Sequence, residues 1–186
     1  MKCSVLLTMN APMRKVILQL AVSLDGFIEG PNGEFDWCFT DDDYGMTEFF
    51  KRIDAIFIGR KSYELTLTMG GSAPPGFPAL KEYVFSKSLN KVEGNRILVS
   101  GDLTKEVNKI KNEPGKDIWL YGGAALTSSF INLGLVDEMA LAVHPILLGA
   151  GKPLFQNIPG RVPLELINTQ TYPSGLVMLS YKLKNK

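Results

Sequence analysis

Residues 118–126 read Ile-Trp-Leu-Tyr-Gly-Gly-Ala-Ala-Leu, and this stretch decides the predicted fold. Its first four residues are apolar and aromatic types that favour a buried β-strand, whereas the alanines and leucine after the glycines favour a helix. Glycines at such a turn let the backbone approach a ligand closely, and the helix start presents unpaired N–H groups to an anion. The stretch therefore predicts a strand, a turn that can bind phosphate, and a helix.

A second turn of this kind lies upstream, where the apolar residues 54–58 meet Gly59, Arg60, Lys61 and Ser62. This turn adds two cations and a hydroxyl to the helix start, so it suits a phosphorylated ribose. Together the two turns suit one ligand with several phosphates. Each turn by itself is also ordinary packing between a strand and a helix, and neither contains the glycine pattern of a Rossmann unit or a P-loop.

The composition indicates one globular domain. The chain has 186 residues, of which 45% are hydrophobic, so it can bury a core without disulfides. Its formal net charge of +1 gives no general attraction to nucleic acid or to an anionic membrane, and we expect neither as a partner. The two cysteines and one histidine have no metal-binding spacing, so no metal is expected, and the low cysteine content favours the cytoplasm.

The order of the predicted elements indicates a mainly parallel sheet. Strands are expected at 15–22, 54–58, 82–85, 96–99 and 117–121, and helices at 43–53, 60–66, 103–112 and 123–133. Their alternation favours parallel crossover connections. The last third differs, because strands at 137–147, 162–171 and 175–182 have no helix between them, and the turn at 172–175 predicts an antiparallel hairpin.

The remaining segments are expected to be irregular. Residues 23–37 form a loop rich in glycine, and a Gly/Pro-rich loop at 69–76 is placed to rim a pocket. Residues 1–13 are expected to be a dispensable tail, with Met13 as an alternative start of translation, and residues 14–186 a single domain.

Several motifs occur in the order and spacing of a known family. They are Leu-Ala-Val-Ser-Leu-Asp-Gly at 20–26, Ile-Gly-Arg-Lys-Ser-Tyr at 58–63, Val-Phe-Ser-Lys at 84–87, Leu-Tyr-Gly-Gly-Ala at 120–124, Val-Asp-Glu at 136–138 and His-Pro-Ile-Leu-Leu-Gly-Ala-Gly-Lys-Pro-Leu-Phe at 144–155. Over residues 14–183 the chain thus resembles the dihydrofolate reductase fold, and within it the stand-alone relatives of the C-terminal reductase domain of the bifunctional riboflavin-biosynthesis deaminase/reductase. The run at 145–151 favours this riboflavin-type branch over true dihydrofolate reductases.

The resemblance implies an α/β fold of three layers, αβα, with a mainly parallel mixed sheet and a C-terminal antiparallel hairpin. It implies NADPH as cofactor, across the carboxyl ends of the parallel strands. The implied cofactor-binding residues are Gly59, Arg60, Lys61 and Ser62 at the pyrophosphate and 2′-phosphate, Ser86 and Lys87 at the adenosine phosphate, Gly122, Gly123, Ala124 and Leu126 over the pyrophosphate, and Ala21 and Ile28 near the nicotinamide. Relatives also tend to have a cis peptide at the glycine pair, and they form homodimers, here expected through residues 137–147 and 149–155.

The implied activity is reduction of a small heterocyclic or ribosylated substrate, as in 5-amino-6-(5-phosphoribosylamino)uracil reductase of riboflavin biosynthesis. Dihydrofolate reductase and a non-catalytic nucleotide-binding module remain the alternatives. The carboxylate of the first helix in dihydrofolate reductases aligns near Met46, which counts against a folate role. Asp36 and Asp43 are the candidate catalytic acids, although Asp43 belongs to an aspartate run that also suits a helix cap.

Residues 25–37 occupy the place of the loop that covers the nicotinamide in this family. We expect Asp25 to tie this loop to neighbouring amides, and Trp37 either to cap the pocket or to anchor the loop. His144 is the only side chain with an ordinary pKa near neutrality, and either a direct chemical role or a place at the end of a core face is compatible with its position before Pro145.

Overall fold

The computed structural model describes residues 13–68, 70 and 77–184. Its elements are β1 (Val16–Ser23), β2 (Phe27–Glu29), α1 (Met46–Arg52), β3 (Ile53–Gly59), α2 (Arg60–Thr68), β4 (Lys81–Phe85), β5 (Ile97–Val99), α3 (Leu103–Lys111), β6 (Asp117–Gly122), α4 (Ala124–Asn132), β7 (Glu138–His144), β8 (Lys152–Pro153), β9 (Leu164–Thr171) and β10 (Val177–Leu183). The expected tail, apart from Met13, and the expected loop at 69–76, apart from Gly70, lie outside the described residues. In the described part of the chain, no helix is long and apolar enough to cross a membrane.

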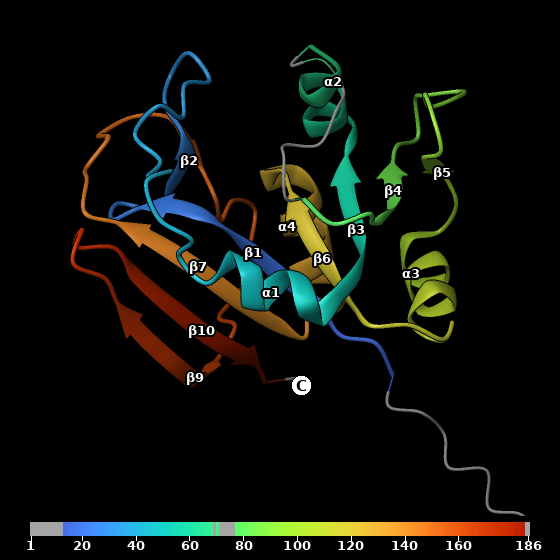
Figure 1. Cartoon of the computed structure of the whole chain (residues 1–186). Helices are drawn as coiled ribbons and strands as arrows, with labels where there is room; N and C mark the ends of the chain where they lie inside the picture. Colours follow the sequence, from blue (N-terminus) through green and yellow to red (C-terminus); the bar gives the residue numbers. More distant parts are fainter. Residues whose placement is uncertain (1–12, 69, 71–76, 185–186) are drawn as a thin grey trace, which may run out of the picture.

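Eight strands form one sheet in the order β5-β4-β3-β6-β1-β7-β10-β9 (Figure 1). Strand β10 is antiparallel to both of its neighbours, and all other neighbouring pairs are parallel. Helices α1 and α2 pack on one face through Phe49 and Tyr63, whereas α3 and α4 pack on the other through Val107 and Phe130. The structure confirms the α/β fold with a mainly parallel mixed sheet and a C-terminal antiparallel hairpin.

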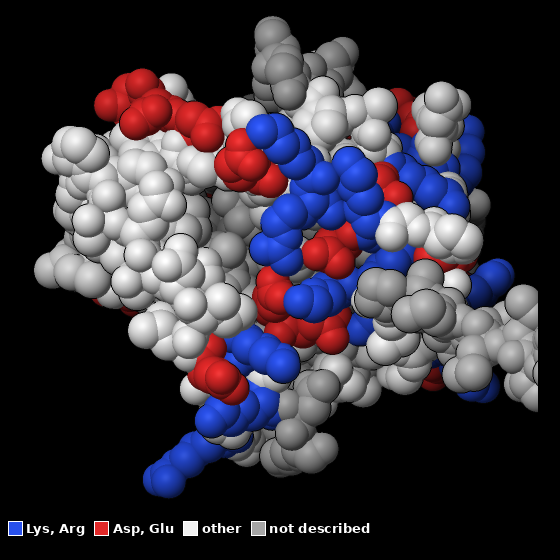
Figure 2. Space-filling model, turned by 60° about the horizontal axis from the view of Figure 1, so that its bottom comes forward, with Lys and Arg blue, Asp and Glu red and all other residues white. Residues whose placement is uncertain are grey.

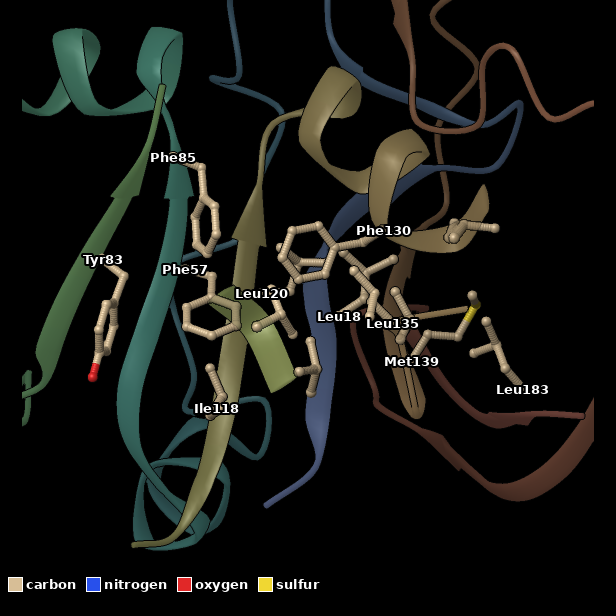
Figure 3. Packing of buried hydrophobic residues seen from close by; sticks show 14 of the residues in the cluster. Leu18, Phe57, Tyr83, Phe85, Ile118, Leu120, Phe130, Leu135, Met139 and Leu183 are labelled. Atoms are coloured by element: carbon tan, nitrogen blue, oxygen red, sulfur yellow. The ribbon is translucent and has the colours of Figure 1, made fainter. Parts of the chain in front are cut away.

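The central strands are buried on both faces, which explains their nearly continuous apolar sequences. Leu18, Phe57 and Leu120 belong to the large cluster with α3 and α4, shown in Figure 3, whereas Ile17 and Trp119 belong to the cluster beneath α1. Successive side chains of a strand point to opposite faces, so each strand supplies both layers. The sheet is therefore a rigid platform for groups at its carboxyl edge.

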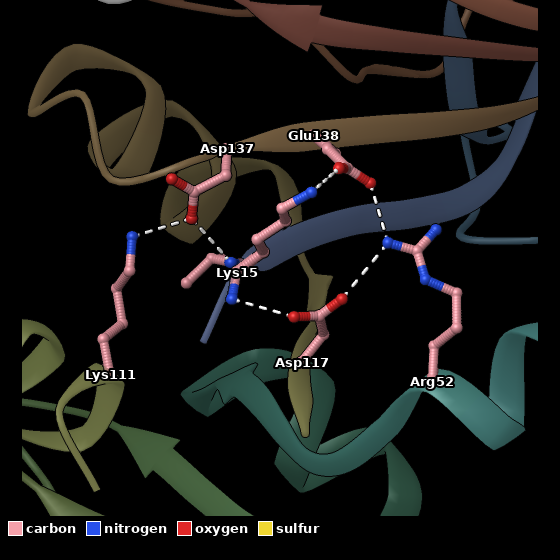
Figure 4. Close-up of polar contacts among 7 residues, drawn as sticks. Lys15, Arg52, Lys111, Asp117, Asp137 and Glu138 are labelled. Atoms are coloured by element: carbon pink, nitrogen blue, oxygen red, sulfur yellow. Dashed lines mark hydrogen bonds and ion pairs between the residues drawn. The ribbon is translucent and has the colours of Figure 1, made fainter. Parts of the chain in front are cut away.

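Charged side chains join the amino ends of the central strands (Figure 4). Glu138 is 2.7 Å from Lys15 Nζ and 2.9 Å from Arg52 Nη2, and Asp137 is 2.7 Å from the buried Lys111 Nζ. Figure 2, which turns the bottom of the molecule forward, shows acidic and basic side chains intermingled on this face. The charges here pair with one another at the end of the sheet opposite to the glycine turns.

Two expected elements have different ends in the structure. The helix expected at 43–53 begins only at Met46, because Gly45 adopts a left-handed conformation with a φ of 80°. It ends at Arg52, and the next residue already starts β3. The strand expected at 137–147 ends at His144, because Pro145 lacks the N–H group that would continue the ladder.

The loop expected at 23–37 contains strand β2, which pairs with β8. Sequence reasoning missed both strands, because segments of three and two residues are too short to show a periodicity. The pairing fastens this loop to the segment that follows β7. The loop thus has a defined position over the carboxyl edge of the sheet.

The residues expected to form a dimer contact, 137–147 and 149–155, are only partly exposed in the structure. Strand β7 lies inside the sheet between β1 and β10, and most of its residues are buried or half-buried. Strand β9 is instead the edge strand, and all eight of its residues are exposed, including Leu166 and Ile167. Further exposed apolar side chains occur at Leu147 and Phe155. Strand β9, and not β7, is therefore the strand at this edge of the sheet that carries exposed apolar side chains.

Candidate active site

The two glycine turns meet at the carboxyl edge of the sheet. Gly59 ends β3 and Gly122 ends β6, and these strands are neighbours. A Cβ atom placed on Gly59 would lie 3.4 Å from the carbonyl oxygen of Gly122 and 3.4 Å from Cβ of Leu126. The turns are thus in contact, and the helices that follow them, α2 and α4, begin beside one point.

The electrostatics of these helix starts favour an anion. Neither α2 nor α4 has an acidic residue in its first turn, and Gly123 at the N-cap of α4 offers no side-chain cap. Helix α2 begins with Arg60 and Lys61, although a cation at a helix N-terminus costs about 0.3–1 kcal/mol. An anion bound here would offset this cost and satisfy free N–H groups.

The immediate surroundings of the glycine pair fit a phosphate group. A Cβ atom on Gly123 would lie 3.1 Å from Ser62 Oγ, so a side chain there would fill the space beside this hydroxyl. The buried hydroxyl of Thr127 has no hydrogen-bond partner among the described residues, and it lies 3.4 Å from the place of a Cβ on Gly122. The peptide bond between Gly122 and Gly123 is cis, as the resemblance implied.

A cavity of about 520 Å³ adjoins this corner. Four of the predicted cofactor residues line it, namely Ala21, Ile28, Ser62 and Gly123. Met46, which the sequence aligned near the carboxylate of dihydrofolate reductases, also lines it. Its walls further include aromatic side chains that the sequence did not identify as site residues: Phe35, Phe39, Tyr44, Trp119 and Tyr121. The cavity therefore extends from the corner formed by the two glycine turns into a largely apolar space.

The other predicted cofactor residues lie outside this lining. Arg60 is exposed on α2, with Nη1 3.7 Å from Glu64, and Lys61 beside it is also exposed. Ser86 and Lys87 follow β4, one strand farther along the same edge, and Ser86 Oγ accepts hydrogen bonds from the backbone of the next turn. Ala124 is buried at the start of α4.

The covering loop is tied to the site as expected. The carboxylate of Asp25 accepts hydrogen bonds from Ser23 Oγ at 2.6 Å and from the backbone N–H groups of Leu148 and Gly149 at 3.2 and 2.8 Å. The hydroxyl of Ser23 and these amides lower the pKa of Asp25. The predicted structural role of Asp25 is confirmed.

The two candidate acids have different positions. Asp43 lines the cavity, but its carboxylate accepts hydrogen bonds from the hydroxyl and the backbone N–H of Thr47, at 2.6 and 2.9 Å. The bond from the Thr47 hydroxyl is the main cause of a lowered pKa at Asp43, so this group is held as an anion at the start of α1. Asp36 is exposed and is not part of the cavity lining.

His144 holds part of the cavity wall. Its Nδ1 lies 2.9 Å from the carbonyl oxygen of Ala142, and its Nε2 accepts a hydrogen bond from the backbone N–H of Phe39 at 3.1 Å. Both contacts are satisfied together only when the ring is neutral and Nδ1 bears the proton. Burial lowers the pKa of His144, which favours this state, and the ring of Trp37 packs edge-on against it at 5.2 Å. Trp37 therefore anchors the loop.

The mixed sheet, with its two glycine turns beside a large apolar cavity, defines an α/β protein of the dihydrofolate reductase-like class. The chain belongs to the family described as the RibD C-terminal domain, which matches residues 14–178. This is a family of reductases of the riboflavin type.

Known proteins agree with this assignment. The chain is 47% identical over 187 residues to "Uncharacterized protein YyaP" of Bacillus subtilis strain 168, across 94% of this chain and 98% of the relative. It also matches the crystal structure of a "Putative riboflavin biosynthesis protein" from Shewanella sp. PV-4 with a TM-score of 0.82 and 25% identity, across 92% and 99% of the two chains. Dihydrofolate reductase from Enterococcus faecalis, complexed with NADP(H), matches in fold with a TM-score of 0.69 and 16% identity, across 92% and 97%.

Proposed function

We propose that this protein is an NADPH-dependent reductase of a small heterocyclic or ribosylated substrate, resembling the 5-amino-6-(5-phosphoribosylamino)uracil reductase of riboflavin biosynthesis. The observation that supports it most directly is the contact between the two glycine turns, which places two helix starts beside one cavity. A dinucleotide needs both features, because its phosphates bind N–H groups while its nicotinamide ring needs an apolar, water-poor space.

Each part of the chain then has a defined task. Gly59, Gly122 and Gly123 let the pyrophosphate approach the backbone, and Arg60 with Lys61 bind the 2′-phosphate, since both side chains extend from the start of α2. Ser62 and Leu126 complete the corner. Ser86 and Lys87, which follow β4 next to β3, bind the phosphate of the adenosine half of the cofactor. Ala124 is buried at the start of α4 and supports this helix start from below.

The reacting centre lies farther inside the cavity. Ala21 and Ile28 position the nicotinamide, which when bound would supply a hydride, and the aromatic walls exclude water from the substrate ring. A proton must follow the hydride. Of Asp36 and Asp43, only Asp43 lines the cavity, and as an anion it positions a water molecule as the proton source.

Two alternative functions, dihydrofolate reductase and a non-catalytic nucleotide-binding module, each fit one feature of the cavity poorly. A dihydrofolate reductase would have a carboxylate near Met46, but here the thioether of Met46 accepts a hydrogen bond from Gln19 Nε2 at 3.1 Å. A non-catalytic nucleotide-binding module has no use for an apolar cavity of about 520 Å³ next to the nicotinamide position. Both observations favour a reductase of a substrate other than folate.

The proposal also includes a cytoplasmic homodimer that pairs along the exposed edge strand β9.

The central experiment is a titration of the purified chain with NADPH, followed by measurement of NADPH consumption in the presence of aminopyrimidine ribosides, their phosphates and dihydrofolate. We expect NADPH binding and turnover of a pyrimidine. Failure to bind NADPH refutes the proposal, and binding without turnover of any ring favours the nucleotide-binding module.

A further inference from the structure

The substrate part of the cavity is built for a flat ring. Besides Ala21 and Ile28, the wall includes the rings of Phe39, Tyr44 and Trp119. Trp119 is fixed in place, because its Nε1 donates a hydrogen bond of 2.8 Å to the carbonyl oxygen of Gln19. Aromatic side chains of this kind bind planar heterocycles by stacking.

The charges around this space repel anions. The charged residues of the lining are Glu29, Asp42, Asp43 and Lys152, and Lys152 Nζ lies 2.8 Å from Glu29 Oε1. The only ammonium group of the described lining is thus already paired, and no arginine belongs to it. His144 is held neutral by burial and by its two backbone contacts. A phosphate on the substrate would meet carboxylates and no free cation.

One buried amide in the cavity can bind the edge of a ring. Gln19 is 7% exposed, and among the described residues its Nε2 donates only to the sulfur of Met46, which is a weak acceptor. Its Oε1 has no hydrogen-bond partner in the described part of the chain. Oε1 is not one of the fully enclosed polar atoms without a partner, so it is accessible, and in the cavity lining it is an available acceptor for an N–H group of a ligand.

We propose that the substrate is a planar heterocycle without a phosphate group and that Gln19 is the residue that recognises its hydrogen-bonding edge. This inference rests on the proposed function, since it assigns the nicotinamide side of the cavity to the cofactor. It departs from the phosphorylated pyrimidine that the family resemblance implies. The difference follows from the lining of this chain's own cavity.

The test compares matched ligand pairs in the presence of saturating NADP⁺, which keeps phosphate groups out of the cofactor corner. The pairs are 5-amino-6-ribosylaminouracil with its 5′-phosphate, and riboflavin with FMN. Binding is followed by isothermal titration calorimetry. We expect the uncharged member to bind at least tenfold more tightly in one pair or both, and the phosphate to be preferred in neither.

Two substitutions separate the contribution of the Asp42 charge to ligand binding from that of the Gln19 amide. Gln19→Leu should weaken the uncharged ligand roughly three- to tenfold, the effect of one hydrogen bond, and leave NADPH affinity unchanged. Asp42→Asn removes an exposed carboxylate from the lining, and it should strengthen binding of the phosphorylated member roughly threefold without affecting the uncharged one. Because Asp42 lies on the surface, this variant is informative even where Gln19→Leu does not fold.

The possible failures can be told apart. If NADPH itself does not bind, the proposed function is refuted, and this inference with it. If NADP⁺ binds but the phosphorylated members bind equally or better, or neither member of either pair binds, the substrate inference is refuted and the cofactor assignment stands. The substrate inference would also be overturned if Gln19→Leu and Asp42→Asn both bound the paired ligands with wild-type affinity.

Discussion

A methyl group at Gly123 is the sharpest probe of the proposed phosphate-binding corner. The backbone of Gly123 has a φ of −74°, which an L-residue adopts without strain, so Gly123→Ala changes the space and not the fold. The added Cβ would lie 3.1 Å from Ser62 Oγ, which moves aside by a few tenths of an ångström. Alanine is a poorer N-cap than glycine, but it also restricts the unfolded chain, so we expect stability to change by less than about 1 kcal/mol.

The effect on the ligand should be larger. A phosphate oxygen in contact with the glycine backbone must withdraw by about 1.5 Å, the length of the new bond. It then loses at least one charge-assisted hydrogen bond, which contributes about 1.5–3 kcal/mol. We therefore expect NADPH affinity to fall at least tenfold, equivalent to about 1.4 kcal/mol. Titration followed by tryptophan fluorescence, to which Trp119 in the cavity lining contributes, measures this change.

The matched control is Gly160→Ala, because no heavy atom lies within 4 Å of a Cβ built on Gly160. It should leave both melting and NADPH affinity unchanged. Thermal unfolding must show that Gly123→Ala still melts cooperatively. A folded Gly123→Ala protein with the wild-type dissociation constant would show that the glycine pair only joins a strand to a helix.

Further predictions concern the cofactor, the assembly and the response to pH. NADPH should bind more tightly than NADH, and Arg60→Ala should reduce this difference in binding free energy by about 1–3 kcal/mol. The control Glu64→Gln removes the ion-pair partner of Arg60 and should not reduce the difference. Equal affinities of the wild-type protein for NADPH and NADH would contradict the prediction. Light scattering should show a dimer that Ile167→Lys on β9 dissociates, and a wild-type monomer at micromolar concentration would refute it. Because burial lowers the pKa of His144 below 6.5, its contribution to stability is complete above pH 6.5 and is lost as pH falls toward the lowered value. His144→Gln should flatten this part of the stability profile, and an unchanged slope would exclude His144 as its source.

Local patterns were sufficient for much of the fold. The apolar runs of the central strands and the glycines that end them predicted a parallel sheet followed by helix starts, since both features depend on residues close in sequence. The C-terminal hairpin was equally local, because Gly175 takes a φ of +86° in its turn. Strands β2 and β8 could not be predicted, because each exists only through pairing with the other, more than 120 positions away.

The walls of the cavity were much less accessible to sequence reasoning. Gln19 is a polar residue in an apolar strand, and the place of its side chain in the cavity appears only when its Nε2 is seen to bind the sulfur of Met46, 27 positions later. The same holds for His144, whose ring receives the N–H of Phe39, 105 positions earlier. The one available signal was the polar Gln19 two residues before Ala21, because such residues share a face of the strand.

The two halves of the candidate site therefore constrain function to different degrees. The proposed phosphate-binding corner is made largely of backbone N–H groups, helix starts and glycines, so it depends on the fold itself and is expected wherever the family's turns occur. The substrate half is made of side chains from many distant segments, and one substitution such as Met46 in place of a carboxylate changes what it accepts. A family relationship consequently supports the cofactor more strongly than the substrate. The substrate must be inferred from the charges and hydrogen-bonding groups of this chain's own cavity, which favour an uncharged ring.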